Sequence, residues 1–287
     1  MDEHGDTARE ESAWAGRLGG DFRARLFSGF AMGIVALLLT LAGVIPFAVL
    51  VVAVSVVVAW EWGRLVHGSE ERTILAVHVG TTAAAGLLAA LGYVGLGLLT
   101  LPIGAILATV LSLGRNSMFS ALGVFYTGFP AVALIWLRSD PALGLLATVF
   151  VIAVVVVTDT GAFVSGRLLK GPLLWARVSP KKTWAGLAGG VIASAVLGAL
   201  FWFAIPYASS LRLAATGAVL AVVAQAGDLA ESALKRRFGA KDTSAIIPGH
   251  GGVMDRVDGL IAAASAVALA ALVIDMHSPA RALLYGL

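Results

Sequence analysis

Long apolar stretches make up most of this chain, and short polar segments separate them. A helix that crosses about 30 Å of hydrocarbon at a rise of about 1.5 Å per residue needs roughly 20 apolar residues. Nine stretches come close to that length: residues 26–44, 46–62, 74–92, 94–113, 118–137, 142–158, 184–205, 211–227 and 259–276. The pattern therefore predicts an all-α, polytopic integral membrane protein with about nine transmembrane helices.

Two of these boundaries fall inside longer apolar runs. The first two spans are divided at Val44-Ile45-Pro46, because proline favours a break in a helix. The third and fourth are divided between Gly92 and Gly97, where a cluster of glycines suits a tight turn. A single long bent helix is the alternative in both places.

The segment before the first span differs from the rest of the chain. Residues 1–25 are polar and of mixed charge, and we expect them to form a cytoplasmic tail, while residues 26–287 form one integral membrane domain. Apolar residues recur every four positions from Trp14 to Leu26, which favours a short interfacial helix. The pair Gly19-Gly20 favours a frayed tail instead.

The composition agrees with a membrane protein. Of the 287 residues, 59% are hydrophobic and 13% are charged, and the mean hydropathy is +0.92. Soluble domains carry about 25% charged residues. The formal net charge of +3 is too small to indicate a nucleic-acid-binding protein. The chain has no cysteine, which excludes disulfides, thiolate metal sites and cysteine nucleophiles.

The distribution of Lys and Arg tests the number of spans, since cytoplasmic loops are enriched in both. With the N-terminus in the cytoplasm and the C-terminus outside, nine spans place 17 of the 20 basic residues inside. Only Arg138, Arg212 and Arg281 then lie outside. We therefore expect a multi-pass protein of the cell inner (plasma) membrane. Its two long polar loops, 159–183 and 228–258, both face the cytoplasm in this arrangement.

The loop 228–258 carries the densest charge in the chain. Asp228 and Glu231 are three positions apart, as are Asp255 and Asp258, so each pair shares one helix face. Two such pairs could hold one or two hard cations such as Mg²⁺, and nearby Lys and Arg could neutralise phosphate oxygens. The alternatives are solvated ion pairs for the acids and orientation signals for the bases.

A glycine-rich turn lies inside the same loop. The sequence Pro248-Gly249-His250-Gly251-Gly252 predicts a sharp turn whose backbone comes close to a ligand, since glycine lacks a Cβ. We expect its amides to hold a phosphate or the base, and His250 to bind phosphate. A histidine that only fixes the loop is the alternative.

These residues belong to a longer pattern, Ser232-x-Leu234-Lys235-Arg236-x4-Lys241-Asp242-x-Ser244-x2-Ile247-Pro248-x-His250-Gly251-Gly252-Val253-x-Asp255-Arg256-Val257-Asp258. This signature segment, residues 232–258, resembles that of the phosphatidate cytidylyltransferases, also called CDP-diacylglycerol synthases. The likeness extends upstream to Asp159-Thr160-x-Ala162, Ser179-Pro180-Lys181-Lys182-Thr183-Trp184-x-Gly186 and Gly227-Asp228-Leu229-x-Glu231. The first half of the chain matches only as generic apolar spans. Ala185, Phe163 and Pro172 depart from residues common in the family, so no role is assigned to these positions.

The resemblance implies transfer of a cytidylyl group from CTP to phosphatidic acid, giving CDP-diacylglycerol and pyrophosphate for phospholipid biosynthesis. It implies Mg²⁺ and allows a second cation, with Asp228, Asp255 and Asp258 as metal ligands and Glu231 and Asp242 ranked lower. The predicted catalytic residues are the same three aspartates and Lys241. The predicted substrate-binding residues are Ser179, Lys181, Lys182, Thr183, Ser232, Lys235, Arg236, His250, Gly251, Gly252 and Arg256.

Two other functions are alternatives. A related CTP-dependent transferase would act on another lipid acceptor, a polyprenol or an ether lipid. A transporter would place ionisable residues near the middle of its spans, whereas here they gather at the predicted cytoplasmic ends.

The family also suggests a homodimer. The seventh span carries a stripe of small residues that would allow close helix contacts, either between subunits or within one. This stripe consists of Gly186, Gly189, Gly190, Ser194 and Gly198.

Overall fold

A computed structural model describes residues 32–246 and 251–286. The described part contains eight helices that are long and apolar enough to cross a membrane. They are α2 (Val44–His67), α3 (Arg72–Ala90), α4 (Val94–Leu111), α5 (Ser117–Arg138), α6 (Gly144–Leu169), α7 (Trp184–Phe201), α8 (Ser210–Arg237) and α9 (Met254–Ile274). The all-α polytopic fold is thus confirmed. The first predicted span, 26–44, starts outside the described residues, and its described part is a short apolar helix, Met32–Leu41.

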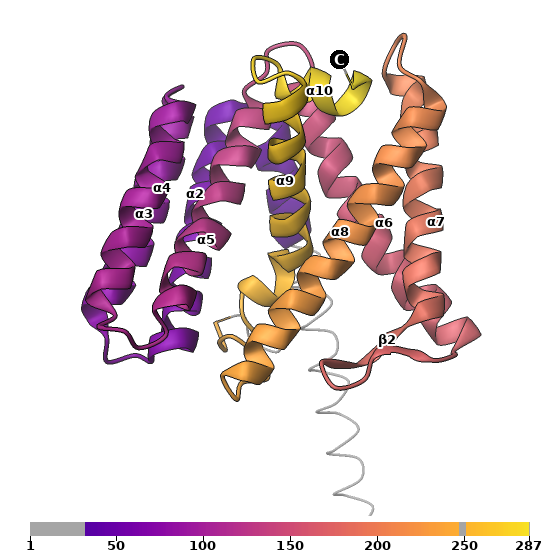
Figure 1. Cartoon of the computed structure of the whole chain (residues 1–287). Coiled ribbons are helices and arrows are strands. Elements are labelled where there is room, and N and C mark those ends of the chain that lie inside the picture. The colour runs from indigo at the N-terminus through magenta and orange to yellow at the C-terminus, as the bar shows by residue number, and fades with distance from the viewer. Residues whose placement is uncertain (1–31, 247–250, 287) are drawn as a thin grey trace, which may run out of the picture.

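The helices form two groups, with α9 between them (Figure 1). The first group is α2 to α5 and the second is α6 to α8, and α9 contacts members of both. One cluster of buried apolar side chains joins Phe47 and Ile135 of the first group to Ala264 of α9. A second cluster joins Phe150 of α6 to Val267 of α9. A third cluster joins Val58 of α2 and Leu234 of α8 to Met254 of α9, so α9 takes part in all three apolar clusters of the described residues.

The breaks between the predicted spans lie close to where the sequence placed them. The first break is at Gly43, whose φ is +131°, just before the predicted Val44-Ile45-Pro46. Pro46 lies in the first turn of α2, where its missing amide hydrogen costs no helical hydrogen bond. The turn between α3 and α4 contains Gly92, whose φ of +90° favours glycine. Both divisions are confirmed, and the single bent helix is wrong in both places.

The two polar segments predicted as loops are partly helical. α6 continues to Leu169 and α8 to Arg237, while α9 begins at Met254, so Asp159, Asp228 and Asp258 lie on helices. The predicted loop bounds 159–183 and 228–258 were too wide because hydropathy marks where a span stops being apolar, not where its helix ends. The Ala, Leu, Glu, Lys and Arg residues at the end of α8 favour a continued helix.

The rest of the first polar segment contains a β-hairpin at the lower end of α6 and α7 (Figure 1). Its strands β1 (Leu173–Trp175) and β2 (Ser179–Thr183) are antiparallel, with Leu173 opposite Thr183 and Trp175 opposite Ser179. Thr183 also caps α7, because its Oγ1 accepts the amide hydrogen of Gly186 at 3.0 Å. A 3₁₀ turn, η1 (Trp202–Ala204), follows α7, and a short helix, α10 (Pro279–Tyr285), follows α9.

The small-residue stripe of α7 packs against α6 and α8 of the same chain. A Cβ added to Gly198 would lie 2.2 Å from the carbonyl oxygen of Leu213 on α8. A Cβ added to Gly189 would lie 2.0 Å from Oγ of Ser165 on α6. Packing within one subunit is therefore confirmed, and the stripe gives no support to a dimer.

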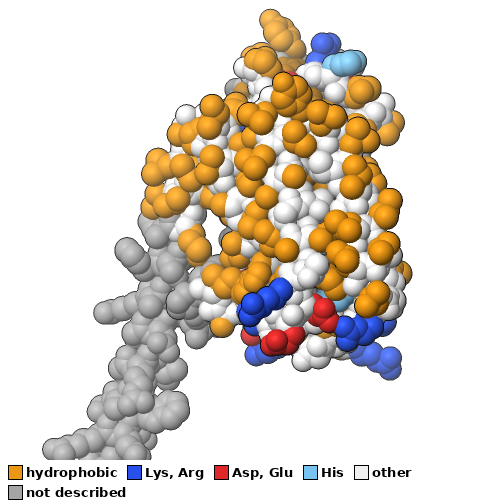
Figure 2. All heavy atoms as spheres, turned by 90° about the vertical axis from the view of Figure 1, so that its left-hand side faces the viewer, with side chains coloured by type: hydrophobic (Ala, Val, Ile, Leu, Met, Phe, Trp, Pro, Cys, Tyr) orange, Lys and Arg blue, Asp and Glu red, His pale blue; other side chains and the backbone are white. Residues whose placement is uncertain are grey.

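Charged side chains gather at one end of the helix bundle, which we call the polar end. It contains the last turns of α2, α6 and α8, the β-hairpin and the first turn of α9 (Figure 1). Figure 2 shows that the face over α3 and α4 is apolar along its height and charged along its lower rim. Arg138, Arg212 and Arg281 belong to the opposite end. Among the described residues, these three arginines are thus separated from the basic residues of the polar end.

Candidate active site

The last turns of α8 supply most of the polar side chains at the polar end. Asp228, Glu231, Ser232 and Lys235 follow one another at spacings of one to three residues along this helix. Residues three and four apart on a helix lie on one face, and here that face is turned towards β2 and α9. α8 therefore joins the two parts of the site that the sequence placed in separate loops.

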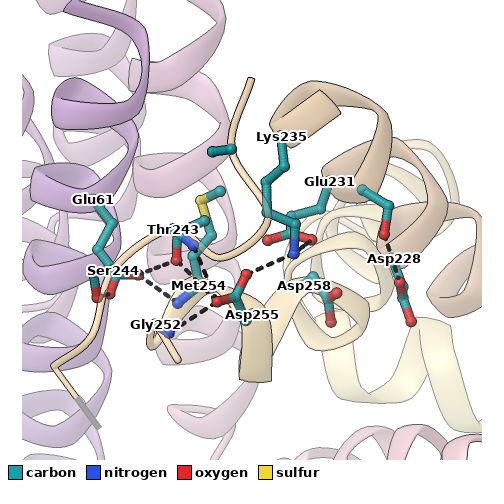
Figure 3. Close-up of polar contacts among 12 residues, drawn as sticks. Glu61, Asp228, Glu231, Lys235, Thr243, Ser244, Gly252, Met254, Asp255 and Asp258 are labelled. Carbon is teal, nitrogen blue, oxygen red and sulfur yellow. Dashed lines mark hydrogen bonds and ion pairs between the residues drawn. The ribbon is translucent and has the colours of Figure 1, made fainter. Parts of the chain in front are cut away.

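Lys235 lies between two carboxylates (Figure 3). Its Nζ is 2.7 Å from Oε2 of Glu231 and 2.7 Å from Oδ1 of Asp255. The three side chains are largely buried, with exposed fractions of 12% for Lys235, 1% for Glu231 and 10% for Asp255. Each charge would be costly in this place without the others. Through its ion pair with Asp255, Lys235 therefore joins α8 to the first turn of α9.

A second ion pair joins β2 to α8. Nζ of Lys182 lies 2.6 Å from Oδ2 of Asp228, and the hydroxyl of Ser232 donates to Oδ1 of Asp228 at 3.4 Å. Asp258 appears between Asp255 and Asp228 in the view of Figure 3. It interacts electrostatically with Asp228 and with Asp159 of α6. Three helices thus each place a carboxylate in the same region.

A cavity of about 500 Å³ opens beside these residues, between α6, β2, α7 and α8. Two acids and three bases line it together with hydroxyl and amide groups: Asp159, Asp228, Arg167, Lys181, Lys182, Ser179, Thr183 and Gln225. Nε2 of Gln225 is buried and has no hydrogen-bond partner within the described residues. Such a lining suits a ligand rich in phosphate, because cationic and neutral donors can both bind phosphate oxygens.

The model of the cytidylyltransferase family matches residues 23–274, which is most of the chain. The chain belongs to this family. Its expected resemblance is thereby confirmed, and the match also covers the first half, where the sequence motifs gave only generic apolar spans.

Several curated proteins that are similar to this chain are named phosphatidate cytidylyltransferase. The phosphatidate cytidylyltransferase of Brucella suis is 36% identical over 250 residues, which cover 85% of this chain and 91% of that protein. The phosphatidate cytidylyltransferase of Bacillus subtilis is 31% identical over 264 residues, covering 84% and 94%. The phosphatidate cytidylyltransferase of Staphylococcus haemolyticus is 39% identical over 155 residues, covering 52% and 58%.

Most of the predicted site residues come together at the ion pairs and the cavity just described. They are Asp228, Asp255, Asp258, Glu231, Lys235, Ser232, Ser179, Lys181, Lys182 and Thr183.

Other predicted residues lie apart from this group. Lys241 and Asp242 are exposed beyond the end of α8, and Asp242 borders a different cavity, of about 570 Å³, with Trp60 and Arg64. Arg236 is exposed and donates to the carbonyl oxygen of Ala240 at 3.2 Å.

Two further predicted substrate-binding residues are Arg256 and His250. Arg256 is exposed in the first turn of α9. The prediction for His250 lies outside the described residues.

The two described glycines of the predicted phosphate turn have internal roles. Gly251 has a φ of +81°, as the predicted sharp turn requires. The amide of Gly252 donates to Oδ2 of Asp255 at 2.8 Å, so it is bonded within the protein. A Cβ on Gly252 would lie 1.9 Å from Oγ1 of Thr243. Close packing inside the protein therefore accounts for glycine at position 252.

The predicted metal ligands differ in what their carboxylates contact. In the described ranges 32–246 and 251–286, no group of three His, Asp or Glu side chains is arranged to hold a metal ion. Asp255 and Glu231 are bound to Lys235, so the full ligand set stays a prediction. Asp228 and Asp258 fit a hard cation better, because their charges and that of Asp159 face one region and supply carboxylate oxygens.

Sequence reasoning missed two acids at this site. Glu61 is the only Asp or Glu between Asp21 and Glu70, and an acid inside an apolar span is a signal that could have found it. Asp159 was quoted only as part of the resemblance. Its place beside Asp228 depends on α6 remaining helical past the end of the predicted sixth span.

Proposed function

We propose that this chain transfers the cytidylyl group of CTP to phosphatidic acid, giving CDP-diacylglycerol and pyrophosphate. The observation that carries the proposal is the cavity between α6, β2, α7 and α8, where basic side chains, hydroxyl groups and carboxylates line one space at the end of apolar helices. Membership of the cytidylyltransferase family and relatives named phosphatidate cytidylyltransferase support this substrate pair.

The reaction asks the protein mainly to hold two phosphates close together. An oxygen of the lipid phosphate attacks the α-phosphorus of CTP, and the bond from that phosphorus to pyrophosphate breaks with its electron pair going to pyrophosphate. In this proposal Lys181, Lys182 and Arg167 bind oxygens of the triphosphate. Lys182 exchanges its contact with Asp228 for a phosphate oxygen, since both residues already line the cavity. Positioning and neutralisation of charge are the main contributions in transfers of this kind.

We further propose that Asp228 and Asp258 hold a divalent cation such as Mg²⁺, with Asp255 as the third predicted ligand. When bound, such a cation neutralises charge on the triphosphate. Lys182 then leaves Asp228 for the nucleotide, which frees a carboxylate that is already on the cavity wall. Asp159 adds negative charge next to both aspartates.

The direct test supplies purified protein with CTP labelled at its α-phosphate, Mg²⁺ and phosphatidic acid in mixed micelles. We expect label to enter the lipid fraction in a one-to-one ratio with released pyrophosphate. A polyprenyl phosphate and an archaeal ether-lipid phosphate are supplied in parallel. Transfer to either of them in preference to phosphatidic acid would replace the proposed acceptor, and no transfer to any lipid would reject the proposal.

We also propose that the polar end faces the cytoplasm and that the protein lies in the inner membrane. Cytoplasmic enrichment of Lys and Arg supports this orientation. The absence of cysteine allows a clean test, because single cysteines can be introduced at Ala240 near the polar end and at Tyr207 near the opposite end. In intact cells, a membrane-impermeant maleimide should label Tyr207→Cys and leave Ala240→Cys unlabelled. The reverse pattern would invert the proposed orientation.

A homodimer is the remaining proposal, and it comes from the family resemblance. Its test is the mass of the detergent-solubilised protein after subtraction of bound detergent. A mass of one chain across the working range of concentration would reject it.

A further inference from the structure

Glu61 is a fully buried acid in the last part of α2, in an otherwise apolar run. Its side chain has an exposed fraction of 0%. Figure 3 shows that it points away from the pairs of α8, towards the signature segment on the far side of Asp255. A buried carboxylate is retained at such a cost only if the surrounding groups satisfy its oxygens.

Four donors from the signature segment satisfy this carboxylate. The amide of Val253 donates to Oε1 at 2.9 Å, and the amide of Met254 donates to Oε2 at 2.7 Å. Oγ1 of Thr243 donates to Oε2 at 3.2 Å, and the hydroxyl of Ser244 donates to Oε1. One carboxylate therefore binds both described sides of the loop that leads from α8 to α9.

Two of these bonds complete the N-terminus of α9. The first amides of a helix have no partner within the helix, and Val253 at the N-cap has no side-chain acceptor to offer. Glu61 supplies the acceptor from a helix 192 positions earlier in the chain. Its carboxylate also lies at the positive end of the helix dipole, as acceptors at a helix N-terminus commonly do.

The loop held by Glu61 also holds Asp255. Oδ2 of Asp255 accepts the amide hydrogens of Gly252 at 2.8 Å and of Thr243 at 3.2 Å, while Oδ1 contacts Lys235. Thr243 therefore contacts both acids, since its hydroxyl lies 3.2 Å from Glu61 and 3.3 Å from Asp255. Any shift of this loop away from Glu61 moves the groups that orient Asp255.

Glycine at position 252 permits this arrangement. A Cβ on Gly252 would lie 2.8 Å and 3.0 Å from the two carboxylate oxygens of Glu61. The close approach of Glu61 and the missing side chain of Gly252 are thus two parts of one contact between α2 and the signature segment.

We propose that Glu61 is a positioning residue for the transfer reaction: it fixes Thr243 and Ser244 on one described side of the loop and Val253 and Met254 on the other, and thereby sets the place of Asp255 at the site. The role of Glu61 in the transfer reaction rests on the proposed function. Its role in fixing the loop rests only on the hydrogen bonds just described. Glu61 acts through the loop and does not itself contact the cavity that we assign to the substrates.

The test compares Glu61→Gln with Glu71→Gln. Glutamine keeps the size of the side chain but replaces one acceptor oxygen by a donor, which then faces an amide or hydroxyl donor of the loop. Glu71 lies near the same end of the bundle in an exposed pair with Arg115, so its variant controls for loss of an acid there. We expect Glu61→Gln to lower kcat at least tenfold with less than a threefold change in the KM for CTP, and Glu71→Gln to change neither.

Hydrogen exchange without metal or substrate gives a second readout. Amides of peptides covering 243–246 and 251–256 should exchange at least tenfold faster in Glu61→Gln than in Glu71→Gln, while peptides of α3 and α4 exchange alike. Normal kcat in folded Glu61→Gln, or normal exchange of this loop, would overturn the proposal.

A variant of the loop itself guards against a failure of Glu61→Gln to fold. Ser244→Ala removes one donor to Glu61 and leaves the acid in place. We expect it to lower kcat about threefold and to speed exchange of the same loop, and wild-type values for both would overturn the proposal. If both single variants fold, their effects on kcat should be less than additive in the double variant, because they act through one contact. Additive effects would also overturn it.

Failure of the proposed function has a different outcome. In that case the wild type and Glu71→Gln transfer no label to phosphatidic acid. The exchange measurements still decide whether Glu61 fixes the loop, and kcat is then compared on the acceptor that the wild type does use.

Discussion

Lys235 offers a quantitative test of how the polar end is held together, because two buried carboxylates depend on it. Methionine keeps most of the side-chain volume and removes the charge, which leaves Glu231 and Asp255 without their shared cation. Removing one partner of a buried ion pair costs about 3–5 kcal/mol. Asp255 keeps the amide hydrogens of Gly252 and Thr243. We therefore expect Lys235→Met to lower the free energy of unfolding by about 3 kcal/mol, at the lower end of that range.

The assay is reversible unfolding in mixed micelles with increasing SDS, followed by tryptophan fluorescence. Arg236→Met is the matched control, because Arg236 is the next residue on α8 and is exposed. Its cost should stay below about 1 kcal/mol. Adding Glu231→Gln to Lys235→Met removes one of the two orphaned charges and should recover about 1–3 kcal/mol. Equal stability of Lys235→Met and Arg236→Met, or no recovery in the double variant, would refute the reasoning.

Three further outcomes follow from the site and the packing. Asp258→Asn should abolish cytidylyl transfer without changing membrane insertion, because orientation follows Lys and Arg; near-normal turnover would remove Asp258 from the predicted ligands. Lys181→Ala should raise the KM for CTP severalfold with little change in kcat, and an unchanged CTP dependence would assign this lysine to orientation alone. Gly198→Val should cost about 1–3 kcal/mol, since its Cβ would lie 2.2 Å from the carbonyl oxygen of Leu213; an unchanged Tm would contradict the close contact of α7 and α8.

The membrane-spanning helices could be predicted well because their length and apolarity are properties of local sequence. The breaks at Gly43 and Gly92 are likewise local, since each depends on a backbone conformation that glycine favours. The ends of α6 and α8 could not be placed by the same means. The helix of α8 runs on through Asp228 to Arg237, where the side chains are polar but favour helix.

The pairing of charges at the site could not be predicted. The signature segment and the motif just before it indicated Lys235, Asp255 and Asp228 as site residues, but Lys235 could have bound any acid or a phosphate. Its partners are fixed by how α8 lies against α9, and the partner of Asp228 is fixed by the hairpin that carries Lys182. Such contacts depend on tertiary packing, as does the burial of Glu61 against a loop near the other end of the chain.

The contact between Glu61 and the amides of Val253 and Met254 has a consequence for biogenesis. Its two sides are separated by more than 190 positions, so α2 is made and inserted long before its partners exist. A ribosome-bound chain that ends before Val253 therefore lacks the two amides that bind Glu61, and one that ends before Thr243 lacks the two hydroxyl donors as well. Truncated products should expose this mismatch to membrane proteases, and catalytic competence should arise only when the last span joins the bundle.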